Sequence, residues 1–347
     1  GVLSALLLWR WAVKVWSIEI GRKALLLLAA LPSLPMLASW AYADMALIFY
    51  VLAALYALTF FESTNVPAWL RMAGVMAGSA MAVKYTSFTV PLTIGVLILF
   101  WRRRSFSQAF GQAAQFGLIA LTVALPWFAR NAIFMWNPFY PFALEGRYWD
   151  AFRNEWYAGP GTGIGWDIVQ LFLLPLNVIL GHRDQNFFDG RLGPLFLILA
   201  PLALWILFSQ ARQGSDRGLS LQAIGLFSAL SFAAWTFGVI NSSHLWQARL
   251  LLPALIPLAI PAALGWDALK AFDSSRFRVS FFLNFVIAVV VVLPVFDSAV
   301  FVVQRNPLAV AVGAQSRSGY IARVNPSYAA LMQLMTELPA EARVYSL

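Results

Sequence analysis

The sequence has no cysteine and none of the short motifs that mark nucleotide-dependent enzymes. The absence of cysteine excludes a disulfide framework, a thiolate metal site and a cysteine nucleophile. No Walker A loop, dinucleotide glycine fingerprint, HExxH or GxSxG sequence occurs, so a nucleotide cofactor and chemistry on ATP or a nucleotide sugar are disfavoured. The glycine-rich run at 159–165 follows no predicted strand, and we interpret it as a flexible loop rather than a phosphate cradle.

Charged residues are also scarce. They make up 11% of the chain and hydrophobic residues 61%, whereas a soluble domain carries about 25% charged residues. The formal net charge is nevertheless +9. No basic run is interleaved with aromatic residues on a polar segment, so nucleic acid is not an expected partner. The composition instead predicts a helical integral membrane protein whose partners include membrane lipids.

Apolar segments follow one another with short polar breaks from residue 1 to about residue 296. We predict an all-α membrane domain over 1–296, because a spanning helix needs about 17–25 mostly apolar residues. The run 168–181 carries Pro175 and polar flanks, which favours an interfacial helix within a long outer loop at 131–190. Residues 297–347 are predicted to be an outer-face tail leading to a soluble domain, and another span is expected before Gly1. The ten predicted spans are 1–16, 22–40, 44–61, 67–83, 86–101, 109–130, 191–209, 219–240, 249–266 and 279–296.

The distribution of charge predicts which ends of the spans face the cytoplasm. Five alternate segments, starting with the turn between the first two predicted spans, hold 13 of the 24 Lys and Arg and five acidic residues, a net charge of +8. The rest of the chain has a net charge of +1. Because Lys and Arg concentrate on the cytoplasmic side of membrane proteins, we assign these segments, including Arg102–Arg104, to the cytoplasm.

Four ionisable residues at the outer ends of predicted spans are not explained by this rule. The carboxylate of Asp44 can cap its helix, or serve as a catalytic group or metal ligand at the mouth of a cavity. Lys84, Arg130 and Arg249 can anchor helices at the interface, or bind an anionic phosphate. Tyr42, two residues before Asp44 in the same turn, is a further candidate for substrate binding.

Both histidines, His182 and His244, fall in predicted outer loops. Imidazole and carboxylate suit zinc or manganese, so the two histidines with Asp44 suggest a divalent metal ion as a cofactor. The other interpretation is that each is an ordinary polar loop residue. Spacing alone does not show that the three side chains converge.

Several stretches resemble the GT-C superfamily, in particular the membrane glycosyltransferases related to protein O-mannosyltransferases and to the lipid A aminoarabinose transferase. The tail 306–344 resembles the linker to an outer soluble domain in bacterial members. The resemblance therefore implies a GT-C-like fold in the bacterial inner membrane, with its active face outward. The stretches are ALPSLPMLASWAYADMALIFYVLAALYAL, GVMAGSAMAVKYTSFTVPL, LPWFARNAIFMWNPFYPF, GPLFLILAPLALW and SHLWQARLLLPALIPLAIPAAL.

The resemblance also implies an activity. Its members transfer a sugar from a polyprenyl-phosphate donor to an acceptor hydroxyl, so the expected partner is such a lipid, and no protein partner is indicated. The general base implied by the resemblance lies in a loop expected before Gly1. Asp44 matches a second acidic position that helps to bind metal or acceptor. Lys84 and Arg249 match basic positions at outer helix ends, and His182 and His244 have weaker counterparts.

Two other functions remain open at this point. A non-catalytic membrane scaffold, or a subunit that binds lipid or pigment, would also use many aromatic residues, and the chain has 15 Trp and 28 Phe. A transporter with broken helices is a third interpretation, although no inverted repeat is evident in the sequence.

The charge distribution predicts that residues 131–190 and the tail lie on the side opposite Arg102–Arg104. Because the chain has no native cysteine, Ser105→Cys and Ser318→Cys can each be labelled singly in intact membrane vesicles with a reagent that does not cross the bilayer. We expect the two variants to be modified from opposite sides. Modification of both from the same side would contradict the topology.

Overall fold

The computed structural model describes residues 1–39, 42–142, 144–180, 192–211 and 215–339, and within them it contains helices and no β-strand. The chain divides into two compact units, Gly1–Val292 and Leu293–Leu347. The second unit contains the end of α14, then α15 (Leu308–Ala311), α16 (Arg317–Val324) and α17 (Pro326–Glu337).

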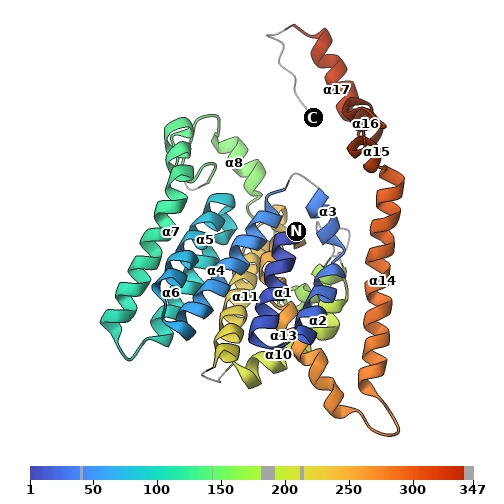
Figure 1. The fold of residues 1–347 in the computed structure, drawn as a ribbon. Helices are drawn as coiled ribbons and strands as arrows, with labels where there is room; N and C mark the ends of the chain where they lie inside the picture. The colour runs from blue at the N-terminus through green and yellow to red at the C-terminus, as the bar shows by residue number, and fades with distance from the viewer. Residues whose placement is uncertain (40–41, 143, 181–191, 212–214, 340–347) are drawn as a thin grey trace. The chain divides into compact units, whose positions relative to one another are not determined.

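The first unit is a bundle of antiparallel helices (Figure 1). Its elements are α1 (Val2–Val15), α2 (Ile18–Ala29), α3 (Ser33–Ser39), α4 (Asp44–Thr64), α5 (Pro67–Val83), η1 (Tyr85–Phe88), α6 (Thr89–Trp101), α7 (Phe106–Met135), α8 (Ala151–Ala158), α9 (Ile168–Leu180), α10 (Leu195–Gln210), α11 (Asp216–Asn241), η2 (Ser243–Leu245), η3 (Ala248–Leu251), α12 (Leu252–Leu255), α13 (Ala259–Ala268), η4 (Leu269–Phe272) and the first part of α14 (Val279–Arg305).

Helices occupy the places of all ten predicted spans, but fewer are long enough to cross a membrane as single helices. Within the described ranges, α4, α7, α11 and α14 qualify by length and composition, and a fifth crossing arises if residues 248–272 form one broken span. The chain is therefore an integral membrane protein.

Residues 22–40 were predicted as one span, yet α2 ends at Ala29 and Pro32 precedes α3. Pro257 lies at the 63° bend in 248–272; proline lacks the amide hydrogen that a continuous helix needs.

Burial shows which helices lie inside the bundle. The most apolar part of α4 is 72% buried, against 17% for that of α7. α4 packs against α1, α5 and α11, so it runs through the middle of the first unit. α7 packs against α5 and α6 on one side only, and its apolar outer face suits contact with lipid.

Small residues bring α5 and α7 close together. Gly74 lies against Ile119, with 2.9 Å between an ideal Cβ at Gly74 and Ile119 Cγ2, and a Cβ at Gly78 would meet the carbonyl oxygen of Ala120. Small residues allow helices to pack this closely in membrane proteins.

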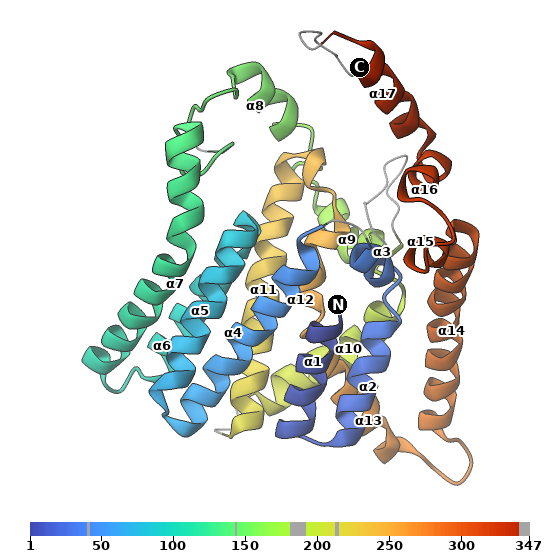
Figure 2. The same cartoon turned by 45° about the horizontal axis from the view of Figure 1, so that its top comes forward.

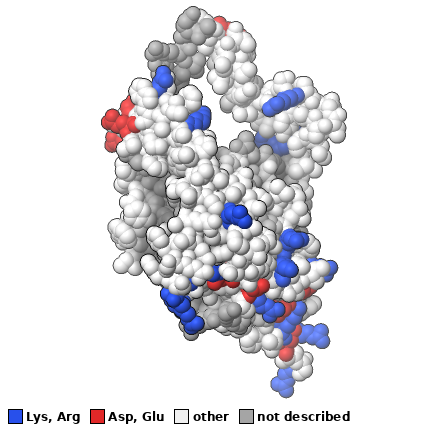
Figure 3. All heavy atoms as spheres, turned by 60° about the vertical axis from the view of Figure 1, so that its left-hand side comes forward, with Lys and Arg blue, Asp and Glu red and all other residues white. Residues whose placement is uncertain are grey.

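Ion pairs join helices at the end of the bundle that carries the α6–α7 turn. Lys23, 5% exposed, lies 2.6 Å from Asp267, which also pairs with Lys270 at 2.7 Å. Arg102 Nε donates to Glu62 at 2.9 Å. Figure 3 shows charged side chains gathered at one end of one face, with a mostly uncharged surface beyond them. Within the first unit, α8 lies at the end opposite the α6–α7 turn (Figures 1 and 2).

Close packing of α5 on α7 generates a prediction about stability. Gly78→Ala should lower the free energy of unfolding by about 1–3 kcal/mol, because the added methyl group overpacks the contact with Ala120. Gly117→Ala on α7 is the matched control, since a Cβ there meets no atom within 4 Å. Thermal unfolding of the detergent-solubilised chain measures both variants. Equal midpoints for the two would contradict the proposed contact.

Candidate functional site

The first pair of site residues lies where α4 begins and α5 ends. Asp44 opens α4 and is 3% exposed, and its Oδ1 lies 2.8 Å from Nζ of Lys84, which directly follows α5. The N-cap position of α4 is occupied by Ala43, which makes no side-chain capping bond. Asp44 is the first residue of the helix, and its carboxylate pairs with Lys84. Its negative charge also suits the first turn of α4, where the helix dipole is positive.

Arg249 reaches the same region from a distant part of the chain. It lies in η3, where its Nε and Nη2 donate to Gln247 Oε1 at 3.1 and 2.7 Å. Its Cζ stands 4.2 Å from the centre of the Tyr42 ring, a favourable cation–π geometry. Tyr42 precedes Asp44 by two residues. The structure thus brings four of the predicted residues together, although Arg249 and Asp44 are more than 200 positions apart.

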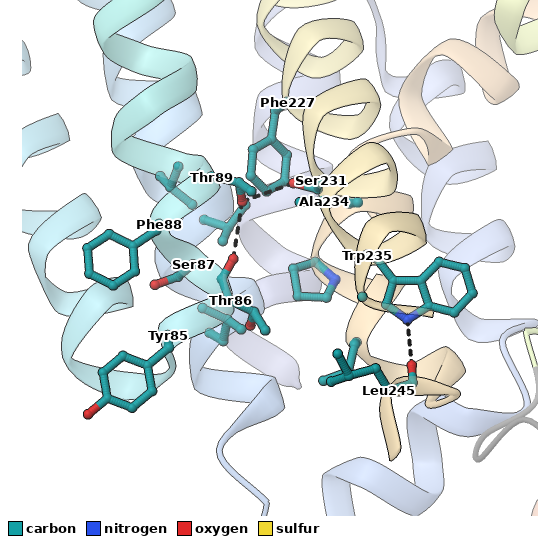
Figure 4. Close-up of a pocket in the computed structure, with 17 residues that line it drawn as sticks. Tyr85, Thr86, Ser87, Phe88, Thr89, Phe227, Ser231, Ala234, Trp235 and Leu245 are labelled. Carbon is teal, nitrogen blue, oxygen red and sulfur yellow. Dashed lines mark hydrogen bonds between the residues drawn. The ribbon is translucent and has the colours of Figure 1, made fainter. Parts of the chain in front are cut away.

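An apolar cavity of about 280 Å³ adjoins this group between α4, η1–α6, α11 and α12 (Figure 4). Leu47, one turn after Asp44, lines it, as do Tyr85 and Leu250, the neighbours of Lys84 and Arg249. A hydrogen bond of 3.1 Å from Ser231 Oγ to Thr89 Oγ1 joins α11 and α6 across it, and Trp235 Nε1 donates to the carbonyl of Leu245. Apolar walls with cations beside them suit an amphiphilic ligand that has an anionic head.

His244 borders a different cavity. It lies in η2, and its carbonyl accepts a hydrogen bond of 2.8 Å from Gln247 Nε2. Its imidazole lies against Gly159, where an ideal Cβ would be 2.9 Å from Nε2. A cavity of about 570 Å³ opens between η2 and α8 and is lined by His244, Glu155 and Trp156 among others.

The glycine-rich run is an ordered strap, so the prediction of a flexible loop is wrong. The amides of Gly161, Ile164 and Gly165 donate to the carbonyls of Asn241, Val239 and Ile240 at 2.9, 3.1 and 3.0 Å. A Cβ at Gly163 would collide with the backbone of Ile240. Gly163 is therefore needed because two backbone segments approach closely, whereas Gly161 and Gly165 adopt positive φ, which glycine tolerates best.

Of the remaining predicted residues, Arg130 has no contact with the group around Asp44 among the interactions of the described residues. Arg130 is exposed and its Cζ lies 5.4 Å from the centre of the Trp127 ring on its own helix, the arrangement of an interfacial anchor. His182 lies outside the described residues. Among the residues that are described, no three His, Cys, Asp or Glu side chains form a group able to hold a metal ion. The metal role of Asp44 and His244 therefore stays a prediction.

Two contacts beside Lys84 were not anticipated. The hydroxyl of Tyr85 donates to the carbonyl of Tyr140 at 2.8 Å and accepts from Asn131 Nδ2 at 3.2 Å. Asn131 is 4% exposed near the end of α7. These bonds attach the loop after α7 to η1. The available signal was an asparagine directly after Arg130 near the end of a mostly apolar helix, where an amide that becomes buried needs a partner.

Comparisons with known proteins agree with the predicted fold. Residues 1–129 match the family described as dolichyl-phosphate-mannose-protein mannosyltransferase. The fold is similar to the crystal structure of ArnT from Cupriavidus metallidurans bound to undecaprenyl phosphate, with a TM-score of 0.54 and 15% identity. The match covers 78% of this chain and 44% of that chain, so this chain spans less than half the length of ArnT. No curated protein sequence matches. The predicted GT-C-like, all-α membrane fold is confirmed.

The ion pair of Asp44 and Lys84 can be tested through stability. Lys84→Ala should lower the free energy of unfolding by about 1–3 kcal/mol, because it leaves a buried carboxylate without its partner. The double variant Asp44→Ala/Lys84→Ala should recover part of this loss. Thermal unfolding in detergent measures both.

Arg153→Ala is the matched control, since its pair with Asp150 is 51% and 59% exposed; exposed pairs contribute about 0–1 kcal/mol. The two side chains are not coupled if the double variant loses as much stability as Asp44→Ala and Lys84→Ala lose together. That result would contradict the ion pair.

Proposed function

We propose that this chain is the membrane part of a GT-C glycosyltransferase that takes its sugar from a polyprenyl-phosphate carrier on the outer face of the membrane. The observation that carries the proposal is the position of Lys84 and Arg249 beside an apolar cavity of about 280 Å³. Such a site suits a ligand with an anionic phosphate next to a hydrocarbon chain. Membrane lipids carrying a phosphorylated sugar have this form.

The comparisons support the same class of donor. The family matched by residues 1–129 is named for dolichyl-phosphate-mannose, and the ArnT structure holds undecaprenyl phosphate. In both molecules a phosphate is attached to a long isoprenoid chain. The concentration of Lys and Arg at the opposite face supports an outward orientation of the site, and we place the protein in a bacterial inner membrane.

The charged side chains of the site determine how it would bind the donor phosphate. Asp44 Oδ1 pairs with Nζ of Lys84 at 2.8 Å, and the guanidinium of Arg249 lies beside this pair on the ring of Tyr42. The ammonium of Lys84 has three donors and gives one to Asp44, which leaves others to hydrogen-bond a phosphate. We therefore assign Asp44 to positioning Lys84 rather than to accepting the proton of the acceptor.

The cations would also assist the departure of the lipid phosphate. In an inverting transfer the acceptor oxygen loses its proton to a base and forms a bond to the anomeric carbon. The bond from that carbon to the phosphate oxygen breaks, and the phosphate keeps the electron pair. A singly charged phosphodiester becomes a monoester that carries about −1.5 to −2. Lys84 and Arg249 would thus bind the leaving group more tightly than the donor, which is how electrostatic catalysis lowers a barrier.

Lipid binding tests the proposal. Arg249→Ala, and the double variant Asp44→Ala/Lys84→Ala, should each weaken binding of undecaprenyl phosphate by about 10- to 150-fold, the loss expected for one charge-assisted hydrogen bond. Asp44→Asn should leave the affinity within a few-fold. Titration of the lipid against the detergent-solubilised chain, followed by native mass spectrometry, gives the dissociation constants.

Arg147→Ala is the matched control, because this exposed arginine also stacks on a tyrosine, Tyr148, at 4.8 Å in the outer loop. Arg130→Ala should behave like it, since Arg130 is exposed and stacks on Trp127 of its own helix. Unchanged affinity in the Arg249 and Lys84 variants would remove the donor site. The fold would then be better explained as a non-catalytic lipid-binding scaffold.

A further inference from the structure

The cavity between α8 and η2 is separate from the apolar cavity beside Lys84. The two share a wall, because Leu245 lines the apolar one and its neighbour His244 lines the other. We propose that this second cavity binds the sugar part of the acceptor, an uncharged, hydroxyl-rich ring. The proposal rests on the function proposed above. Its lining includes Phe152, Glu155, Trp156, Gly159, Thr162 and His244.

The first argument is the exposed aromatic surface of α8. Phe152 and Trp156 are one helical turn apart and stack with ring centres 6.3 Å apart and planes at 27°. They are 71% and 66% exposed, and no residue of α8 is buried. The face of an aromatic ring is electron-rich and attracts partially positive hydrogens, such as the C–H groups on one face of a sugar ring. A pyranose is also the right size to lie over a stacked pair.

The second argument comes from the polar groups around these rings. Glu155 lies between them in sequence, and its carboxylate has no hydrogen bond or ion pair in the described part of the chain. A carboxylate accepts hydrogen bonds from hydroxyl groups. Among the described residues that line this cavity there is no Lys or Arg. A phosphate would therefore be repelled, whereas an uncharged ring with hydroxyl groups would be hydrogen-bonded.

The third argument is the connection between the two cavities. Gln247 donates to the carbonyl of His244 at 2.8 Å and accepts from Arg249 at 2.7 Å. Arg249 in turn stacks on Tyr42, beside the pair of Asp44 and Lys84. One continuous set of contacts therefore joins the second cavity to the proposed phosphate site. A transferase needs this proximity, because the acceptor hydroxyl attacks the carbon that is bonded to the donor phosphate.

Saturation-transfer difference NMR on the full chain in nanodiscs tests the proposal. The probes are the methyl glycosides of glucose, galactose, mannose and N-acetylglucosamine. We expect at least one of them to receive saturation from the protein. Trp156→Ala should reduce this signal by about 2- to 10-fold, the range for loss of one aromatic contact, and Glu155→Gln should reduce it as well.

Trp166→Ala is the matched control, because Trp166 is 75% exposed in the same loop but does not line the cavity. It should leave the signal unchanged. Absence of signal for all four glycosides, or equal signals in the wild-type chain and Trp156→Ala, would overturn the proposal.

Insertion of α8 into the membrane surface is the competing explanation of its exposed aromatic residues. A fluorophore on Phe152→Cys, placed in the otherwise cysteine-free chain, reports it through quenching by spin-labelled lipids. Strong quenching would overturn the sugar site in favour of a membrane contact.

Undecaprenyl phosphate binding is measured on the same variants. If Trp156→Ala retains this binding, a lost glycoside signal is specific to the second cavity. If the wild-type chain does not bind the lipid, the proposed function fails whatever the glycoside result.

Discussion

The end of the bundle opposite the α6–α7 turn depends on the ion pair between Asp44 and Lys84. A carboxylate that is 3% exposed is costly unless a cation or hydrogen-bond donors compensate for its lost hydration. Because Asp44 begins α4 and Lys84 follows α5, the pair joins the ends of two helices that also pack along their length. Lys84 is thereby held next to Tyr85 and the apolar cavity. An isolated lysine at this depth would instead extend toward water.

The two ends of the bundle use charge differently. At the end with the α6–α7 turn, Lys23 and Lys270 share Asp267, and Arg102 pairs with Glu62. These pairs connect α2 with α13 and α4 with the end of α6. At the other end, Asp44 pairs with Lys84, and Arg249 stacks on Tyr42 beside this pair. The proposed phosphate site depends on the position of these two cations beside an apolar cavity, rather than on the total charge of +9.

The short segment from the end of α11 to η3 contributes residues to the lining of both cavities. Leu245 and His244 face different cavities although they are adjacent. Gln247 holds Arg249 on one side and the backbone of η2 on the other. The strap at 159–165 packs its backbone on the end of α11, which positions α8 above this segment. A donor cavity and an acceptor cavity that share a wall of one helical turn would place two substrates side by side.

The sequence alone determined the class of the protein, the places of its helices and the chemical types at the helix ends, and it predicts an orientation. Hydropathy is a local property, so segment lengths suffice to place the helices, and the positive-inside rule supplies the predicted orientation. Only the tertiary structure decided that Asp44 pairs with Lys84, that Arg249 joins them through Tyr42, and that Arg130 does not. Such contacts depend on the rotation and tilt of each helix, which are set by packing between residues 40 or 200 positions apart. The strap at 159–165 was misinterpreted for the same reason, because Gly163 permits the close approach of the Ile240 backbone, a segment distant in the sequence.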